Sequence, residues 1–320
     1  MAAQYLRFPY QARRRPPRVA APELWCCYPG GPKGRPYVAI LLLFSGLISA
    51  PLLAGDLKPQ TLDAFHRYES LTESRIAKQV SDPGVFLYIN TLPPAERSRA
   101  YASLMGGEIY IAPLTTLDAS GQTIEAPHGL IHHWVAAVFI PGVTMAETLK
   151  VLQDYDHKQD DYPEVARSRL LHRDGNHFEA YMRLQEHRVI TVTLDAEFDV
   201  TYSERDERHW FATSRSTRVR QVEDAGKPGE RDLPEGEGEG FLWQLDSYWQ
   251  DVEQDGGVYV ELEALSLTRD VPSGLGWLIR PFITSVPRQS LESTLESTRK
   301  AVLKRRQTTP HRGRVSLPGS

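Results

Sequence analysis

The stretch 256–303 most constrains the fold, because it joins a strand to a long apolar helix. From Val258 to Ala264 every second residue is apolar, which is typical of a strand with one buried face. Pro272-Ser273-Gly274 ends this alternation, and apolar side chains then recur at helical spacing from Leu275 to Val286. Such a helix must bury its apolar stripe, and the strands upstream offer the only surface large enough to receive it.

The region upstream of this helix predicts an antiparallel sheet. Leu130 to Ile140 is apolar at nearly every position, which indicates a strand buried on both faces, and Val189 to Tyr202 alternates apolar and polar residues throughout. Asp174-Gly175 is a hairpin signal between two further strands. Thr144 followed by Glu147 has the spacing of a capping box, so a short helix begins there. Strands joined by hairpins form an antiparallel sheet, which the C-terminal helix would cover.

The residues before this region divide into a leader and a helical extension. The uncharged apolar run Val38 to Ala54 follows a basic stretch and ends in small residues, the layout of a secretory signal peptide. The run is near the short limit for a membrane span, so an uncleaved anchor at residues 38–54 is the alternative. We expect a leader at 1–55, a mainly helical extension at 56–126, the sheet-and-helix domain at 127–305 and a disordered basic tail at 306–320.

Charge and cysteine content exclude several classes of function. The net charge is -4, yet residues 1–55 hold seven of the 37 Lys and Arg residues and one of the 41 acidic residues. The remainder is therefore strongly acidic, which argues against nucleic acid as a partner. Cys26 and Cys27 both precede the apolar run, so a cleaved product would contain no thiolate for a disulfide, a zinc site or an iron–sulfur cluster.

Three histidines, His128, His132 and His133, raise the question of a metal site, since imidazole is a common zinc ligand. On a strand, His132 and His133 point to opposite faces and cannot easily share one ion, so we expect one to be buried and the other exposed. The Glu-Gly run 235–240 lacks the ligand pattern of a calcium loop and is interpreted as a solvated loop. The sequence contains no phosphate loop, nucleophile elbow or metalloprotease helix, so we predict no metal, no cofactor and no catalytic residue.

The predicted order is one strand, two short helices, a run of antiparallel strands and one long helix that opens with Gly274-Leu275-Gly276-Trp277. This order resembles the helix-grip fold of the START-like superfamily, which includes polyketide cyclases and plant pathogenesis-related allergens, over about residues 127–303. The resemblance implies an α+β fold in which a curved antiparallel sheet grips the C-terminal helix. It also implies an apolar tunnel between them for a lipid, sterol or polyketide-like ligand.

The leading functional hypothesis is an exported, non-catalytic protein, periplasmic or secreted, that carries a hydrophobic small molecule or lipid between sheet and helix. A cyclase or aromatase is one alternative, and it would need acids and bases converging inside the tunnel. An envelope structural protein whose N-terminal extension binds a partner is another. The leader or the basic tail would add a peripheral contact with a membrane.

Candidate ligand-binding residues are bulky side chains expected between sheet and helix, where aromatic rings can stack on a flat ligand; ordinary core packing is the plain alternative. Arginines at the mouth could bind a carboxylate or phosphate group, although surface ion pairs are their commoner role. Pro281 and Pro287 each remove a backbone donor and predict a kink or a break in the last helix. The cavity-lining candidates are Trp134, Phe178, Met182, Leu194, Trp243, Leu275, Leu278 and Phe282, and the mouth candidates are Arg183, Arg215 and Arg280.

Overall fold

A computed structural model describes residues 57–187, 191–270 and 276–308. Its centre is an antiparallel sheet in the order β1-β2-β9-β8-β6-β5-β4-β3, with the short strand β7 beside β6. The strands are β1 (Tyr110–Pro113), β2 (Gly129–Pro141), β3 (Val165–Asp174), β4 (His177–His187), β5 (Thr191–Asp206), β6 (His209–Glu223), β7 (Arg231–Asp232), β8 (Gln244–Gln254) and β9 (Gly257–Arg269).

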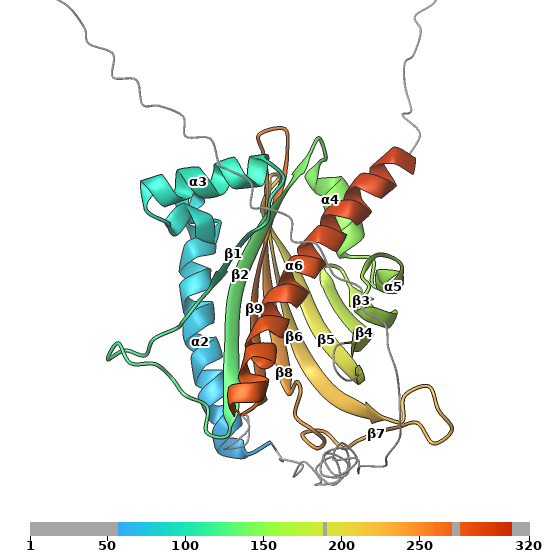
Figure 1. Ribbon diagram of the computed structural model, residues 1–320. Helices are drawn as coiled ribbons and strands as arrows, with labels where there is room; N and C mark the ends of the chain where they lie inside the picture. Colours follow the sequence, from blue (N-terminus) through green and yellow to red (C-terminus); the bar gives the residue numbers. More distant parts are fainter. Residues whose placement is uncertain (1–56, 188–190, 271–275, 309–320) are drawn as a thin grey trace, which may run out of the picture. The chain divides into compact units, whose positions relative to one another are not determined.

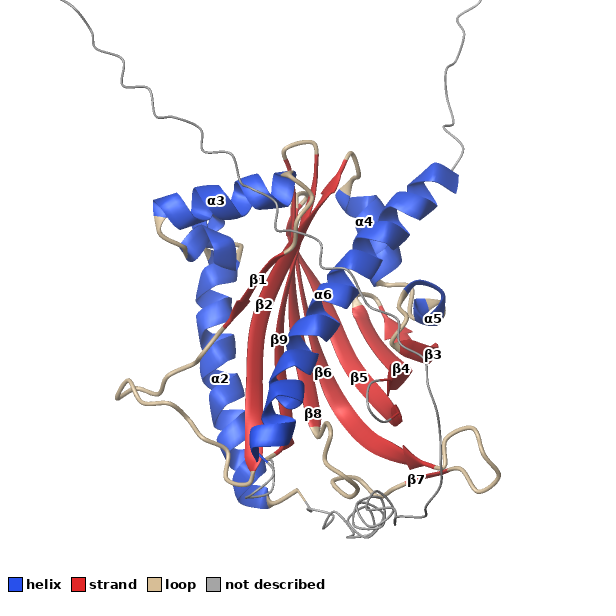
Figure 2. Ribbon diagram, viewed as in Figure 1, coloured by secondary structure: helices blue, strands red, loops and turns tan. Residues whose placement is uncertain are grey.

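Helices lie against both faces of the sheet (Figures 1 and 2). They are α2 (Pro59–Ser81), α3 (Pro94–Met105), α4 (Met145–Leu152), α5 (Lys158–Asp161) and α6 (Gly276–Thr308), with the 3-10 turns η1 (Pro83–Val85) and η2 (Tyr88–Thr91). Figure 1 shows α6 crossing the curved sheet from the start of β2 towards α4. The predicted α+β class is confirmed, and so is the helix-grip arrangement of a sheet curved around the last helix.

The face of the sheet that packs against α6 is here called the inner face. Alternate residues of β2, β5 and β9 meet there with α4, and for β5 and β9 the period-2 patterns predicted this. The capping box of α4 is present, since the Thr144 side chain accepts from the Glu147 amide and the Glu147 side chain bonds back to residue 144. Leu291, Leu295 and Val302 of α6 are buried in the same core.

The opposite, outer face is also buried over β2, β9 and part of β8. One cluster there joins Phe139 and Tyr259 to η1, η2 and α3, and another joins Leu265 and Leu267 to α2. The alternation in β9 predicted a strand with only one buried face, and this prediction is wrong. Tyr259, Glu261 and Glu263 are buried because the N-terminal elements cover them.

The N-terminal elements belong to the same compact unit as the sheet. The predicted helices in the segment 57–105 are present as α2 and α3, and β1 pairs with β2 at the edge of the sheet. This segment covers part of the outer face. The leader 1–55 and the tail beyond residue 308 lie outside the described residues.

The last helix is continuous from Gly276 to Thr308, across both Pro281 and Pro287. The predicted break near Pro287 is therefore wrong. A proline removes one backbone donor, but the helix that follows it is held in the inner core by the buried Leu291 and Leu295. Within the described ranges, no helix is long and apolar enough to span a membrane.

Candidate functional site: the inner face of the sheet

The inner face divides into two halves that differ in how tightly they are covered. Towards α4 and the C-terminal part of α6 the packing is closed, and Val138, Val260 and Leu295 are fully buried. Phe178 lies in this closed half, and its ring contacts those of Tyr155 and Tyr202. This half is core in the ordinary sense.

The half nearer the start of α6 keeps apolar side chains partly exposed. Trp134, Ala264 and Ser247 lie side by side in register across β2, β9 and β8. All three are partly exposed, although they belong to the face that α6 crosses. The apolar members of this surface, here called the apolar floor, are Trp134, Met182, Leu184, Val192, Leu245, Trp249 and Ala264.

Hydroxyl side chains cross the same half of the inner face. Ser214 and Ser247 are paired across β6 and β8. Ser216 accepts from the Leu245 amide at 2.9 Å, and its Oγ donates to Gln244 Oε1 at 3.1 Å. These hydroxyls place hydrogen-bond donors and acceptors on an otherwise apolar surface.

His132 lies on the inner face, and its Nε2 is 2.9 Å from Thr268 Oγ1. Burial lowers the pKa of His132 to about 4, so the ring is neutral at neutral pH. His133 faces the outer side, which confirms that the two rings point to opposite faces. The expectation that one of them would be exposed is wrong, because both are buried, and Tyr68 of α2 covers His133.

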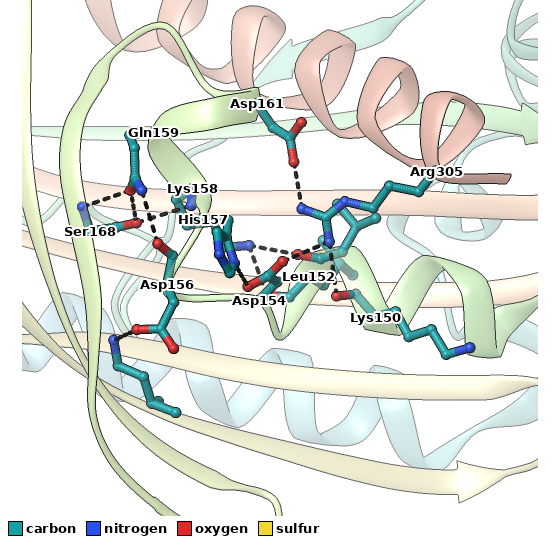
Figure 3. A network of polar contacts seen from close by, with 12 residues as sticks. Lys150, Leu152, Asp154, Asp156, His157, Lys158, Gln159, Asp161, Ser168 and Arg305 are labelled. Atoms are coloured by element: carbon teal, nitrogen blue, oxygen red, sulfur yellow. Dashed lines mark hydrogen bonds and ion pairs between the residues drawn. The ribbon is translucent and has the colours of Figure 1, made fainter. Parts of the chain in front are cut away.

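Buried polar groups tie α6 to α4 and α5 at the closed end (Figure 3). Lys158 Nζ donates to the carbonyls of Val151 and Leu152 at 3.0 and 2.8 Å, which caps the last turn of α4. Burial lowers the pKa of Lys158 to about 7. Arg305 of α6 contacts Asp154 at 2.8 Å and Asp161 at 2.7 Å. This network fastens one end of α6.

Three tyrosines lie beside this network within the core. The hydroxyls of Tyr155 and Tyr202 are 3.0 Å apart, and that of Tyr202 donates to the Leu152 carbonyl at 3.0 Å. The Tyr162 hydroxyl is 3.0 Å from Thr298 Oγ1. Burial raises the pKa of Tyr162 to about 12, so it stays a neutral hydroxyl at neutral pH.

A second buried polar network joins α2 to the outer face. The Tyr68 hydroxyl is 2.9 Å from His133 Nδ1, and His133 Nε2 is 2.6 Å from Glu263 Oε1. Arg75 of α2 also contacts the fully buried Glu263 carboxylate. Although these residues resemble a proton relay, all but Arg75 are buried, and we interpret them as the attachment of α2.

Two further acids on the outer face are held in neutral form. Glu261 Oε1 accepts from the Tyr88 amide at 2.6 Å, and burial raises its pKa to about 8. Burial, with Glu69 nearby, raises the pKa of Asp246 to about 8 as well. The attachment of α2 therefore places ionisable groups in a poorly solvated interface.

The predicted site residues are divided between the two faces. Trp134, Met182 and Leu194 lie on the inner face around the apolar floor, and Phe178 lies there at the closed end. Trp243 does not line this surface: β8 begins only at Gln244, and Trp243 packs in the outer core with Leu265 and Leu267. Trp243 and Leu245 are two residues apart yet lie on different faces, because Trp243 precedes the strand.

Three arginines were predicted at the mouth, and the structure describes the side chains of two of them. Neither lies at a mouth of the inner face. Arg183 pairs across strands with Asp195 at 2.7 Å and also contacts Glu230 at 2.8 Å. Arg215 contacts Glu69 and Glu73 of α2 on the outer face. Both arginines therefore make ion pairs, the commoner role. Leu275 and the side chains of Leu278, Arg280 and Phe282 lie outside the described residues.

Asp251 and Lys158 are buried polar groups of the inner core that the sequence patterns did not identify. Asp251 follows Trp249 in the inner phase of β8, so the period of the strand contained the signal. Lys158 carried no signal, because its two acceptors are set by how α4 ends. In the described part of the chain, no group of three or more His, Cys, Asp or Glu side chains could hold a metal ion.

An open groove of about 720 Å³ lies beside the middle of α6. It is lined by Gly107, Glu108, Ile109, Gln289, Glu292, Ser293, Glu296 and Arg299. Arg299 donates to the Gly107 carbonyl at 2.7 Å and joins the two walls. Most of the residues that line it are polar or charged, and in this respect the groove differs from the apolar floor.

Neither protein-family models nor curated proteins match this sequence. Solved structures of similar fold include human STARD10 (12% identity, TM-score 0.41, covering 69% of this chain and 85% of that one). A STAR-related lipid transfer protein from Xanthomonas axonopodis is 20% identical with a TM-score of 0.37, covering 60% and 98%. Zhui aromatase/cyclase from Streptomyces sp. R1128 is 12% identical with a TM-score of 0.38, covering 56% and 98%. These are likenesses of fold.

Proposed function

We propose that this protein binds and carries a hydrophobic, lipid-like molecule between the inner face of its sheet and α6. The observation that carries the proposal is the apolar floor, which stays partly exposed on a face crossed by a helix. Exposed apolar surface of this kind is stabilised by covering it, at about 25 cal/mol per Å². A guest that covers about 200 Å² of it would gain roughly 5 kcal/mol before the cost of association.

The partner is therefore a small amphiphile, and the fastened end of α6 fits that function. The network of Arg305 and Lys158 holds the C-terminal part of the helix, while the apolar floor lies near its N-terminal part. A helix held at one end leaves the other end free to adjust to a guest.

A fluorescence titration with diphenylhexatriene, which emits strongly in apolar surroundings, tests this proposal. The parent protein should take up the probe, and Ala264→Trp should weaken uptake by about tenfold or more, because the new ring fills the space beside Trp134. Thr201→Trp adds the same ring on the exposed outer side of β5 and should leave uptake unchanged. Equal uptake by the parent and Ala264→Trp would remove the apolar floor as the binding surface.

A cyclase-type enzyme is the second candidate, favoured by the titratable groups in the inner core. Lys158, with its lowered pKa, and the neutral Tyr202 are of the types used in acid–base chemistry. However, Lys158 donates to two carbonyls and the Tyr202 hydroxyl donates to a third. These hydrogen bonds favour a structural role, so the carrier remains the preferred function.

Export is part of the same proposal and is supported by the leader 1–55. Cleavage near Ala54 would release a periplasmic or secreted carrier, whereas retention of residues 38–54 would leave it anchored to the membrane. The N-terminal sequence of the mature protein distinguishes the two. A mature chain that begins at Met1 and is recovered from the soluble cytoplasm would contradict both.

A further inference from the structure

The inner face contains a buried acid whose role the packing does not explain. Asp251 of β8 lies in register between Trp210 of β6 and Val260 of β9. Its side chain is 1% exposed, and its Oδ1 has no hydrogen-bond partner among the described residues. A buried polar atom without a partner costs free energy, so its presence calls for a function.

The surroundings of Asp251 hold it as a neutral acid. Burial raises its pKa well above the usual value, and within the described residues no cation offsets that shift. A protonated carboxyl can donate one hydrogen bond. The polar groups nearby already have other partners. The Tyr202 hydroxyl bonds to the Leu152 carbonyl, the Tyr162 hydroxyl bonds to Thr298, and Lys158 donates to the end of α4.

Asp251 also lies where the apolar floor meets the closed half of the inner face. Trp249, two residues earlier on the same face of β8, and Trp210, directly opposite on β6, are both partly exposed. In the same row of the sheet, Val260 and Val138 are fully buried, so the closed half begins at the level of Asp251. A guest on the apolar floor would therefore have Asp251 at its inner end.

We propose that Asp251 anchors the polar end of the carried molecule by donating a hydrogen bond to a neutral acceptor, such as a ketone or ester carbonyl. This inference rests on the proposed carrier function. A carboxylate or phosphate at this position would bring a negative charge into an apolar site beside an acid. The ligand class is thus a long apolar body with an uncharged, hydrogen-bond-accepting end.

Displacement of diphenylhexatriene by two competitors tests the anchor: hexadecane, and the methyl ketone with the same chain length. The parent should bind the ketone about tenfold more tightly than the hydrocarbon, as expected for one buried hydrogen bond. Asp251→Leu should lose this preference, whereas Asp251→Asn, which keeps a neutral donor, should retain most of it. Asp199→Leu on the outer side of β5 is the control and should keep the full preference.

The outcomes separate the two proposals. Equal binding of both competitors by the parent, or an unchanged preference in Asp251→Leu, would overturn the anchor while leaving the carrier intact. Failure of the parent to take up diphenylhexatriene would overturn the carrier, and the anchor with it. Thermal unfolding supplies a second readout, since removing an unpartnered buried acid should raise the melting temperature of Asp251→Leu. A lower melting temperature together with an unchanged preference would assign Asp251 a structural role.

Discussion

The burial and the pKa of single residues on the sheet depend mostly on whether a neighbouring element covers them. Glu261 would be an ordinary surface acid on a bare sheet, yet it is fully buried and accepts from the amides of Tyr88 and Ile89. Its pKa of about 8 means that the folded state keeps a proton that the unfolded state loses near its usual value of 4.5.

The pH dependence of stability follows from this difference. Between the unfolded and folded pKa values of Glu261 the folded state binds more protons, so stability should fall as pH rises through that window and then level off above about 8. Glu261→Gln keeps one acceptor oxygen for the Tyr88 amide, gives up the 3.4 Å contact with the Ile89 amide and cannot ionise. It should unfold with a shallower pH slope and be about 1–3 kcal/mol more stable than the parent at pH 8. Urea unfolding across this range measures the slope, and parallel slopes would contradict the assignment.

Lys158 should give a pH dependence of the opposite sign. Its folded pKa is about 7 against the usual 10.5, so between these values the unfolded state binds more protons and stability should rise with pH. Lys158→Met keeps an apolar stem of similar length but removes the titration and two hydrogen bonds. We expect it to lose the rise above pH 7 in thermal unfolding. If the stability of this variant rose with pH as much as that of the parent, the increase would come from groups other than Lys158.

Two polar networks, one on each side of the sheet, attach helices α2 and α6 to the rest of the fold. The outer network of Tyr68, His133 and Glu263 holds α2, and the inner one of Lys158, Asp161 and Arg305 holds the end of α6. Tyr68, His133, Glu263 and Lys158 are buried, so their hydrogen bonds are strong and costly to leave unmade, whereas Arg305 is partly exposed.

The attachment of α2 depends on the Tyr68 hydroxyl, which bonds to His133 and also accepts from the Thr116 amide at 2.7 Å. Tyr68→Phe should cost about 1–3 kcal/mol of stability, because two buried polar groups lose their partner. Hydrogen exchange should rise first in α2. The control Ser74→Ala removes an exposed hydroxyl of the same helix and should change stability by less than about 0.5 kcal/mol. Equal costs for the two variants would contradict the role of this network.

The sequence predicted elements well where the signal is local. The alternation of Val189 to Tyr202 and the helical spacing after Leu275 correspond to β5 and α6. Prediction from the sequence failed where an element far away in the chain decides whether a side chain is exposed. Glu263 and His133 are buried only because α2 covers them. For the same reason the position of Trp243 could not be derived, since it depends on where β8 begins and on which helix packs there.

At the scale of the whole molecule, the sheet is covered on both sides but not equally. The outer cover closes over β2, β9 and β8, while the outer sides of β4 to β6 carry cross-strand ion pairs such as Arg183–Asp195 and Arg218–Glu197. The inner cover closes over one half only. The proposed carrier function rests on this incomplete inner cover.

Native mass spectrometry after incubation with a lipid extract shows whether the inner face holds a guest. The parent and Thr201→Trp should each retain one amphiphile per chain, and Ala264→Trp should appear almost entirely as the bare protein. Identical spectra for the three proteins, whether all loaded or all bare, would show that the inner face does not hold the guest.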